Sequence, residues 1–484
     1  MKKVLLAVLL LLLVLAAVMA VKTAAYKGRQ VQSNKPPAVI KLDEEALNHL
    51  TQAVRIQTVS YDDTALLNRA EYDSFFRFLH NTYAPVLEQL EDTVIAGRSL
   101  LLKWQGKNTS AKPVIFYAHL DVVPVEESTR DKWLHAPFSG ERADGFIWGR
   151  GTLDDKGSLI ALLEALKADV AANVVPERTI YFAFGSDEEV GGNLGAARIA
   201  DYFRQQHISF EFYVDEGGFV SSGMVPHMSK PVALIGTAEK GYVTLELTVN
   251  KPGGHSSRPA KKTALDVLMA ALTRIHDNPE KGRVVEPVEE FLNFIGPEMP
   301  FPLKTVFANR WFFSPVIMRE YEKSPEGSAL LRTTNVTTVI NAGLKENVIP
   351  TLVSAKVNFR VLNDETTKDV LARITKLIDD TSVVIKAGEL YEPSKNSSSD
   401  SYGFKLLQQT AAEVFPDAMV APFLMLGSTD SKHFQDITEN TYRFFPCRFD
   451  KDQVGSIHGI NERIGEQAFM ETITFYRSLF HNLK

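Results

Sequence analysis

Three groups of acidic and imidazole residues follow short apolar runs of the chain. VIFYA precedes His119, TIYFAF precedes the segment 187–189, and FYV precedes Asp215. Apolar runs of this length, rich in Val, Ile, Phe and Tyr, are typical of buried parallel strands. In open α/β sheets, ligands gather at the carboxyl ends of such strands. We therefore expect these polar residues, which are far apart in the sequence, to converge on one edge of one sheet.

The chain has 484 residues, which is too long for one core of usual size, so two domains are expected. Strand and helix patterns alternate over 42–241 and again over 388–484, which predicts one α/β domain with a mixed sheet built from both flanks. Between them, 242–387 contains strands that alternate apolar and polar residues, in the order β-α-β-β-α-β. The sequence thus predicts a large α/β domain with an inserted, ferredoxin-like domain.

A segment of high aromatic density, about 278–331, interrupts the smaller domain after its first helix. It contains FLNFIGPEMPFPLKTVFANRWFFSPVIM. One interpretation is a helical subdomain with its own core, or a dimer contact. The other is an apolar wall for a greasy substrate, and the sequence alone leaves both open.

The first residues predict export or membrane insertion. Lys2 and Lys3 precede an unbroken apolar run from Val4 to Val21, which just reaches the length that spans a bilayer. Residues 1–21 are therefore expected to be a signal peptide or a membrane anchor, and the polar stretch 22–41 a tether. We expect an extracytoplasmic protein, either membrane-anchored or secreted or periplasmic.

Charge and cysteine content exclude some classes of function. The net charge is -6, and no basic run offsets it, so nothing favours nucleic acid as a partner. Cys447 is the one cysteine, so no intramolecular disulfide can form.

The polar clusters supply the ligands that two divalent metal ions would need. Ions about 3.5–4 Å apart can share one carboxylate and one water. His119 and His458 offer imidazoles, Glu189 and Asp215 offer terminal carboxylates, and Asp154 in GRGTLDDKG offers a bridge. This set gives one bridge and two further ligands for each ion. Because no thiolate takes part, Zn, Mn or Co in a nitrogen and oxygen site is expected.

Two further acidic residues complete the expected chemistry. Glu188, next to a proposed ligand, is the candidate general base, which takes a proton from the bridging water and passes it to the leaving amine. Asp121 lies two residues after His119, on the same side of the chain, and can fix the imidazole tautomer. His433 in SKHF competes with His458 as a ligand on composition alone.

HLDVVP, GRGTLDDKG, DEEVGG and VDEGG resemble the motifs of the co-catalytic zinc peptidases and acylases. This family includes glutamate carboxypeptidase, carnosinase-type dipeptidases, aminoacylase and yeast carboxypeptidase S. GSTDSKHF and HGINERI make the chain most similar to carboxypeptidase S and to the secreted N-fatty-acyl-amino-acid hydrolases and synthases. The resemblance covers nearly the whole chain after about Leu42. It implies a di-zinc aminopeptidase-like catalytic domain with an inserted lid domain.

The resemblance also implies roles for single residues. Asp154, rather than Asp155, bridges the ions, and the peptide bond between the two is cis. Glu188 is the base, Glu189 is a ligand, and the last ligand is His458 rather than His433.

Three residues of the smaller domain match lid residues of the family. His255 in PGGHSSRP resembles a histidine that stabilises the oxyanion, and in dimeric relatives it comes from the partner subunit. Arg360 in NFRVL resembles an arginine that grips the substrate carboxylate. Asn347 in ENVIP is a candidate for holding the substrate. The resemblance leaves open whether the chain forms a homodimer.

The expected function is hydrolysis of an amide bond next to a free carboxylate, with a small-molecule or peptide substrate. Carboxypeptidases and N-acyl-amino-acid amidohydrolases both fit, and the amidohydrolase reaction could also run as a condensation. A dipeptidase or aminoacylase with the same mechanism is an alternative. A non-catalytic, membrane-tethered binding protein is the alternative from another class.

Overall fold

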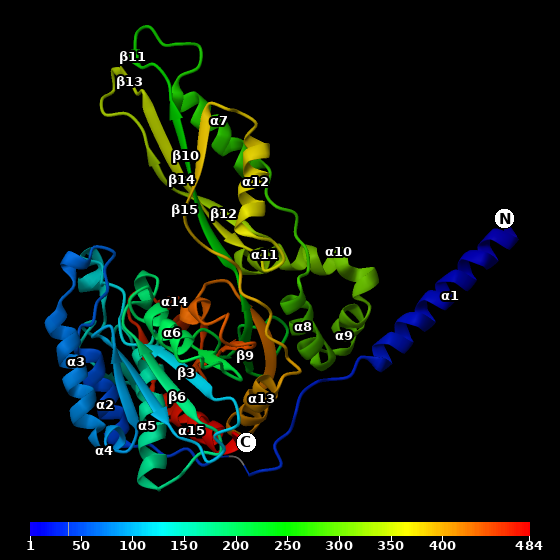
Figure 1. Cartoon of the computed structure of the whole chain (residues 1–484). Coiled ribbons are helices and arrows are strands. Elements are labelled where there is room, and N and C mark those ends of the chain that lie inside the picture. Colours follow the sequence, from blue (N-terminus) through cyan, green and yellow to red (C-terminus); the bar gives the residue numbers. More distant parts are fainter. Residues whose placement is uncertain (37) are drawn as a thin grey trace.

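The computed structural model describes residues 1–36 and 38–484. A mixed sheet of ten strands organises the large domain, with parallel pairs at its centre (Figure 1). In spatial order its strands are β1 (Glu91–Ile95), β2 (Ser99–Trp104), β6 (Ile180–Gly185), β3 (Val114–His119), β7 (Tyr213–Asp215), β17 (Thr441–Arg443), β9 (Val232–Glu239), β8 (Val220–Ser221) and β18 (Arg448–Phe449), with β16 (Met419–Met425) also paired to β9. The predicted α/β class is confirmed.

The three apolar runs form neighbouring parallel strands. β3 pairs in parallel with β6 on one side and with β7 on the other. Every residue of β3 and β6 is buried, in agreement with their unbroken apolar sequences. His119 is level with Gly185 across the β3–β6 pair. The polar residues that follow these strands therefore start from the same edge of the sheet.

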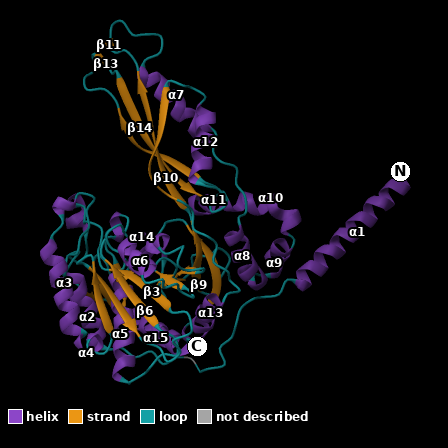
Figure 2. Cartoon of the chain, viewed as in Figure 1, coloured by secondary structure: helices purple, strands orange, loops and turns teal. Residues whose placement is uncertain are grey.

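Helices cover both faces of the sheet, as the purple ribbons of Figure 2 show. One face packs against α2 (Glu44–Arg55), α3 (Arg69–Thr82), α4 (Ala84–Leu87), α5 (Lys156–Ala171), α13 (Tyr402–Val414) and α15 (Glu466–Asn482). The other face packs against α6 (Ala196–Gln205). A short helix, α14 (Lys451–Ser456), and a small sheet of β4 (Glu141–Ala143), β5 (Phe146–Trp148) and β19 (Arg463–Gly465) complete this domain. α3 ends at Thr82 and α4 begins at Ala84 with Pro85 in its first turn, because proline is tolerated there but cannot continue a helix from its interior.

The inserted domain has the predicted β-α-β-β-α-β order. Its elements are β10 (Gly241–Asn250), α7 (Ala264–Asp277), β12 (Thr334–Asn341), β14 (Leu352–Val361), α12 (Thr367–Ile378) and β15 (Val383–Tyr391). The strands form an antiparallel sheet in the order β12-β14-β10-β15, and alternate residues of β10 pack with α7 and α12 in one core. A short ribbon of β11 (Gly254–His255) and β13 (Val348–Ile349) forms the far tip of the domain (Figure 1). β15 extends beyond the expected boundary at 387.

The aromatic insertion is helical. Its helices are α8 (Glu286–Ile295), α9 (Phe301–Ala308), α10 (Arg310–Tyr321) and α11 (Pro325–Leu331). α8 packs against β16, and Phe294 and Ile295 join the main core of the large domain. The helical interpretation therefore describes this segment, although part of its core is shared with the large domain.

The N-terminal helix α1 (Lys2–Ala25) projects from the rest of the protein (Figure 1). Most of its apolar side chains are exposed. Within residues 1–36 and 38–484, α1 is the only helix that is long and apolar enough to cross a membrane.

Candidate metal centre and active site

Two groups of ligand-type side chains share the carboxylate of Asp154. In the first group, His119 Nε2 lies 2.9 Å from Asp154 Oδ1 and 3.4 Å from Glu216 Oε1. In the second, His458 Nε2 lies 2.9 Å from Asp154 Oδ2 and 3.2 Å from Glu189 Oε2. Each oxygen of Asp154 thus faces a different group, which is the arrangement that a bridging carboxylate needs.

The elements around the sheet edge bring these five residues together. His119 ends β3, Glu189 lies in the turn after β6, and Glu216 directly follows β7. Asp154 lies just before α5, and His458 lies in the loop after α14. The polar residues that follow the apolar runs therefore do converge. Asp154 and His458, which are far apart in the sequence, join them from two loops of the same domain.

The structure differs from the sequence prediction at Asp215. Asp215 Oδ2 accepts hydrogen bonds from the Tyr213 hydroxyl at 2.8 Å and from the Ser431 N–H at 3.0 Å. Successive side chains at a strand end point in opposite directions, and the next one, Glu216, is the one that reaches His119. The structure therefore replaces Asp215 with Glu216 as the candidate ligand.

The two ligand groups contain more carboxylates than imidazoles, so their negative charge is only partly balanced. Burial and the charge of Asp154 raise the pKa of Glu189 to about 7 and the pKa of Glu216 to about 8. Hydrogen bonds to Asp154 and Glu189 raise the pKa of His458 to about 10. Glu189 Oε1 is buried and has no hydrogen-bond partner in the described part of the chain. The surplus of carboxylates and the unpaired oxygen fit a site for divalent cations.

Two carboxylates outside these groups fix His119. His119 Nδ1 lies 3.0 Å from the backbone carbonyl oxygen of Asp121 and 3.4 Å from Asp121 Oδ1. The same Asp121 carboxylate accepts the backbone N–H groups of Glu188 at 3.1 Å and Glu189 at 3.2 Å. Asp155 Oδ2 accepts the backbone N–H of His119 at 3.2 Å, and the peptide bond before Asp155 is cis. Asp121 therefore connects the imidazole to the turn that carries both glutamates.

The Glu188 carboxylate has no hydrogen-bond or ion-pair partner among the described residues. Burial and the charge of nearby Asp430 raise the pKa of Glu188 well above its usual value. A carboxylate with a raised affinity for protons is suited to general base catalysis near neutral pH.

A buried carboxylate that sequence reasoning missed, Glu462, holds the Asp154 loop. Its Oε1 accepts three backbone N–H groups at 2.8–3.3 Å, those of Gly151, Leu153 and Asp154. Its Oε2 pairs with Arg150 Nη1 at 2.6 Å, and both side chains are buried. Glu462 belongs to the HGINE motif that also carries the second imidazole, and this shared motif is the signal that could have identified it.

His433, the competing ligand candidate, lies outside both ligand groups of the described chain. Its Nε2 contacts the Gly191 carbonyl oxygen at 3.0 Å. Burial lowers the pKa of His433 below its usual value. The geometry therefore favours His458.

The base of the inserted domain carries Arg360 toward the large domain. Arg360 Nη1 lies 3.5 Å from the Tyr391 hydroxyl, and its guanidinium is 4.9 Å from the centre of the Tyr242 ring. Lys432 Nζ, from the loop after β16, is 5.4 Å from the centre of the Tyr391 ring. Burial lowers the pKa of Lys432, but nearby carboxylates, Glu188 among them, raise it above its usual value. Arg360 and Lys432 thus both lie close to Tyr391, and Lys432 is near enough to Glu188 to feel its charge.

His255 and Asn347 lie at the far tip of the inserted domain instead. His255 Nδ1 is 2.8 Å from Ser257 Oγ, and the Asn347 carbonyl oxygen accepts the Ser256 N–H at 3.1 Å. β10, which connects the base to the tip, would span about 30 Å at the usual rise per residue. The structure therefore does not bring His255 and Asn347 to the ligand groups of the same chain (Figure 1).

Comparison with known families and proteins identifies the fold and the chemistry together. Residues 115–482 match the family described as Peptidase family M20/M25/M40. The chain belongs to this family. The probable carboxypeptidase S-like 2 of Dictyostelium discoideum is 39% identical over 445 residues, which cover 91% of this chain and 85% of the relative. The human N-fatty-acyl-amino acid synthase/hydrolase PM20D1 is 36% identical over 467 residues, which cover 94% and 91%.

Solved structures share this M20 fold. The M20 metallo-carboxypeptidase Sso-CP2 of Sulfolobus solfataricus has a TM-score of 0.69 at 19% identity, covering 91% of this chain and 99% of its own. Human carnosine dipeptidase 1 has a TM-score of 0.64 at 17% identity, covering 91% and 96%. The family resemblance seen in the sequence is thus confirmed, and the M20 chain is a metal-dependent enzyme that hydrolyses amide bonds.

Proposed function

We propose that this M20 enzyme binds two divalent ions, zinc with manganese or cobalt as alternatives, on either side of Asp154. His119 and Glu216 would hold one ion, and Glu189 and His458 would hold the other, with Asp154 common to both groups. The observation that carries this proposal is that each Asp154 oxygen faces its own pair of further ligands. When bound, such ions act as Lewis acids toward a carbonyl oxygen and lower the pKa of water.

The residues of the chain divide the remaining work. Glu188 takes the proton of the attacking water and passes it to the leaving nitrogen as the C–N bond breaks. Asp121 holds the His119 ring in the orientation that presents Nε2 to the centre. His255 of the partner subunit, whose tip reaches the site from outside, donates a hydrogen bond to the carbonyl oxygen as that oxygen gains negative charge.

The substrate carries a free carboxylate next to the scissile amide. Arg360 binds that carboxylate as a bidentate pair, and Asn347 of the partner subunit adds a contact from the tip of that subunit's lid. N-acyl amino acids are the first candidate class, in line with the synthase/hydrolase relatives at 36% identity. Peptides with a free C-terminus are the second, in line with the carboxypeptidase S-like relative at 39% identity. Condensation of a fatty acid and an amino acid is the same reaction in reverse.

The domains take separate roles in this proposal. Residues 42–241 and 388–484 form the catalytic domain, and 242–387 form the lid, which can also serve dimerisation. Residues 1–21 are a membrane anchor or a signal peptide, and 22–41 are a tether. The enzyme then works outside the cytoplasm, as α1 allows.

A substrate and metal panel tests the proposal. The enzyme is stripped with a chelator and reloaded with zinc, manganese or cobalt, and hydrolysis of a long-chain N-acyl amino acid and of a dipeptide is measured. We expect loss of activity without metal, recovery with one of the three ions, and faster turnover of the acyl substrate. The matched control is the same acyl amino acid with its carboxylate converted to a carboxamide, which Arg360 cannot bind as an ion pair. Equal turnover of both forms would contradict the proposed recognition.

A further inference from the structure

Large apolar side chains are exposed on α9 and α10, beside the base of α1. Phe301 is 75% exposed, Trp311 54%, Phe312 48% and Val316 61%. We call these four residues the apolar strip. The opposite side of α10 is turned inward, since Ile317 is buried. Exposed apolar side chains that gather in this way, and are not used by the fold itself, mark contact surfaces.

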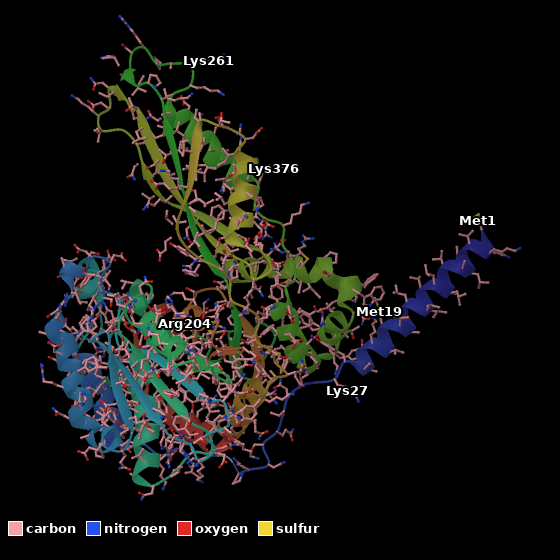
Figure 3. All side chains as sticks on the ribbon, in the orientation of Figure 1. Met1, Met19, Lys27, Arg204, Lys261 and Lys376 are labelled. Carbon is pink, nitrogen blue, oxygen red and sulfur yellow. The ribbon has the colours of Figure 1, made fainter. Side chains whose placement is uncertain are left out.

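The last turns of α1 are bonded to the loop between α9 and α10. The Nδ2 of Asn309, which is buried, donates to the Met19 carbonyl oxygen and to Thr23 Oγ1, both at 3.2 Å. Lys22 Nζ lies 5.3 Å from the centre of the Trp311 ring. Figure 3 shows Met19 close to these helices and Met1 at the free end of α1. These contacts fix the position of the apolar strip relative to the last turns of α1.

The apolar composition of α1 indicates which surroundings the apolar strip meets. The most apolar 18-residue stretch of α1 has a mean hydropathy of 3.4 and is not buried against the protein. A helix that is apolar on all sides and lacks protein neighbours belongs in lipid. Because the end of α1 is bonded to the α9–α10 loop, the lipid surface around α1 must lie close to the strip.

The composition around the strip fits the headgroup region of a bilayer. Trp is enriched at membrane–water interfaces, where its ring is apolar and its N–H stays hydrated. Lys22, Lys304 and Arg319 add positive charge from α1, α9 and α10. The exposed Glu320 on α10 is paired with Lys323 at 2.6 Å, so the balance favours anionic headgroups. Phe312 and Val316, one helical turn apart, would enter the acyl boundary on the same side of α10.

We propose that the apolar strip is a second membrane contact, which docks into the interface of the bilayer; this rests on the membrane-anchor alternative of the proposed function, in which α1 stays in the mature protein and crosses that bilayer. The contact holds the catalytic domain and the lid in one orientation on the membrane instead of leaving them on a flexible tether. The contact does not depend on the hydrolase activity. A substrate with a fatty acyl chain would partition into the same bilayer and reach the enzyme at the membrane surface.

Trp311 provides a direct test, because it is the exposed tryptophan of the described chain. Trp104, Trp133 and Trp148 are 6–8% exposed and lie in the large domain. The full chain is reconstituted in vesicles of phosphatidylcholine and phosphatidylglycerol, with bromine atoms near the start of the acyl chains. We expect the bromolipid to quench the Trp311 emission, while iodide in the water does not. Trp311→Phe removes the quenchable component and identifies its source.

A double variant separates the strip from the anchor. Phe301→Ser with Phe312→Ser leaves α1 unchanged, so the protein stays in the vesicles, but we expect bromolipid quenching of Trp311 to fall at least twofold. Leu344→Ser is the matched control, since Leu344 is fully exposed on the inserted domain, away from α1. It should leave the quenching unchanged.

Two results would overturn the proposal. If iodide reaches Trp311 and bromolipid does not, the strip faces water. If neither quencher reaches it, the strip is covered by protein, such as a second copy of this chain. Hydrolysis of a water-soluble substrate is measured on the same samples, so a failure of the membrane contact is distinguished from a failure of the proposed function.

Discussion

Glu188 and Glu189 are neighbours in sequence, but their side chains have different surroundings. Glu189 faces His458, whereas the Glu188 carboxylate has no partner among the described residues. We expect Glu188→Gln to lower kcat by about 10²–10⁴, because a general base of this kind contributes that much. Metal content measured by atomic emission should stay unchanged, whereas Glu189→Gln should lose both metal and activity. Full activity of Glu188→Gln would exclude it as the base.

Glu216 and Asp215 can be distinguished by their effects on metal content and stability. Glu216→Gln should lose about one metal equivalent per chain, because one ligand group loses a charged oxygen. Asp215→Asn should keep the metal but lose about 1–3 kcal/mol of stability in urea, since its carboxylate is bonded to Tyr213 and Ser431. The reverse result would restore Asp215 as the ligand.

Most of the site could be predicted from the sequence, and the exceptions have physical causes. His119, Asp154, Glu189 and His458 each lie in a motif at the end of a strand or beside a helix. The choice between Asp215 and Glu216 depends on which side chain turns toward the edge where β7 ends, which composition does not show. Glu462 was missed because its partners are mainly backbone N–H groups, so only its place in the HGINE motif beside His458 could have pointed to it.

The loop before α5 depends on one buried ion pair. Glu462 binds Arg150 and three backbone N–H groups of the segment 151–154. Glu462→Gln leaves Arg150 charged and poorly paired, and breaking such a pair typically costs about 3–5 kcal/mol. We expect a loss of that order in chemical denaturation, together with weaker metal binding. Glu466→Gln is the control, because its pair with Arg142 is partly exposed and should cost about 1 kcal/mol or less.

Helices and strands could be predicted where their sequences follow one clear pattern of apolar residues. β3, β6 and β10 follow directly from unbroken or alternating apolar residues. The aromatic insertion was ambiguous, because its helices share their core with the large domain and still expose part of their apolar surface. Burial of that kind is decided by tertiary contacts, not by local pattern.

The inserted domain carries its candidate functional residues at opposite ends, one strand length apart. Arg360 is level with Tyr242 at the base, next to Tyr391, whereas His255 lies in the ribbon at the tip. About 30 Å of rigid antiparallel sheet lies between the two. One small substrate therefore cannot contact Arg360 and His255 of the same chain. If both act in one site, the histidine must come from a partner subunit.

Mixing two inactive variants tests this arrangement. His255→Ala keeps Glu188, and Glu188→Ala keeps His255, so a mixed dimer with crossed lids contains one complete site. With free subunit exchange at equal amounts, half of the dimers are mixed and each has one of two sites intact, which gives about one quarter of wild-type activity. Each variant alone should stay nearly inactive. Sedimentation confirms that dimers form, and mixed dimers isolated with two affinity tags provide the sharper measurement. If the isolated mixed dimers are as inactive as the parents, His255 acts within its own chain, and the lid must bend between its base and its tip.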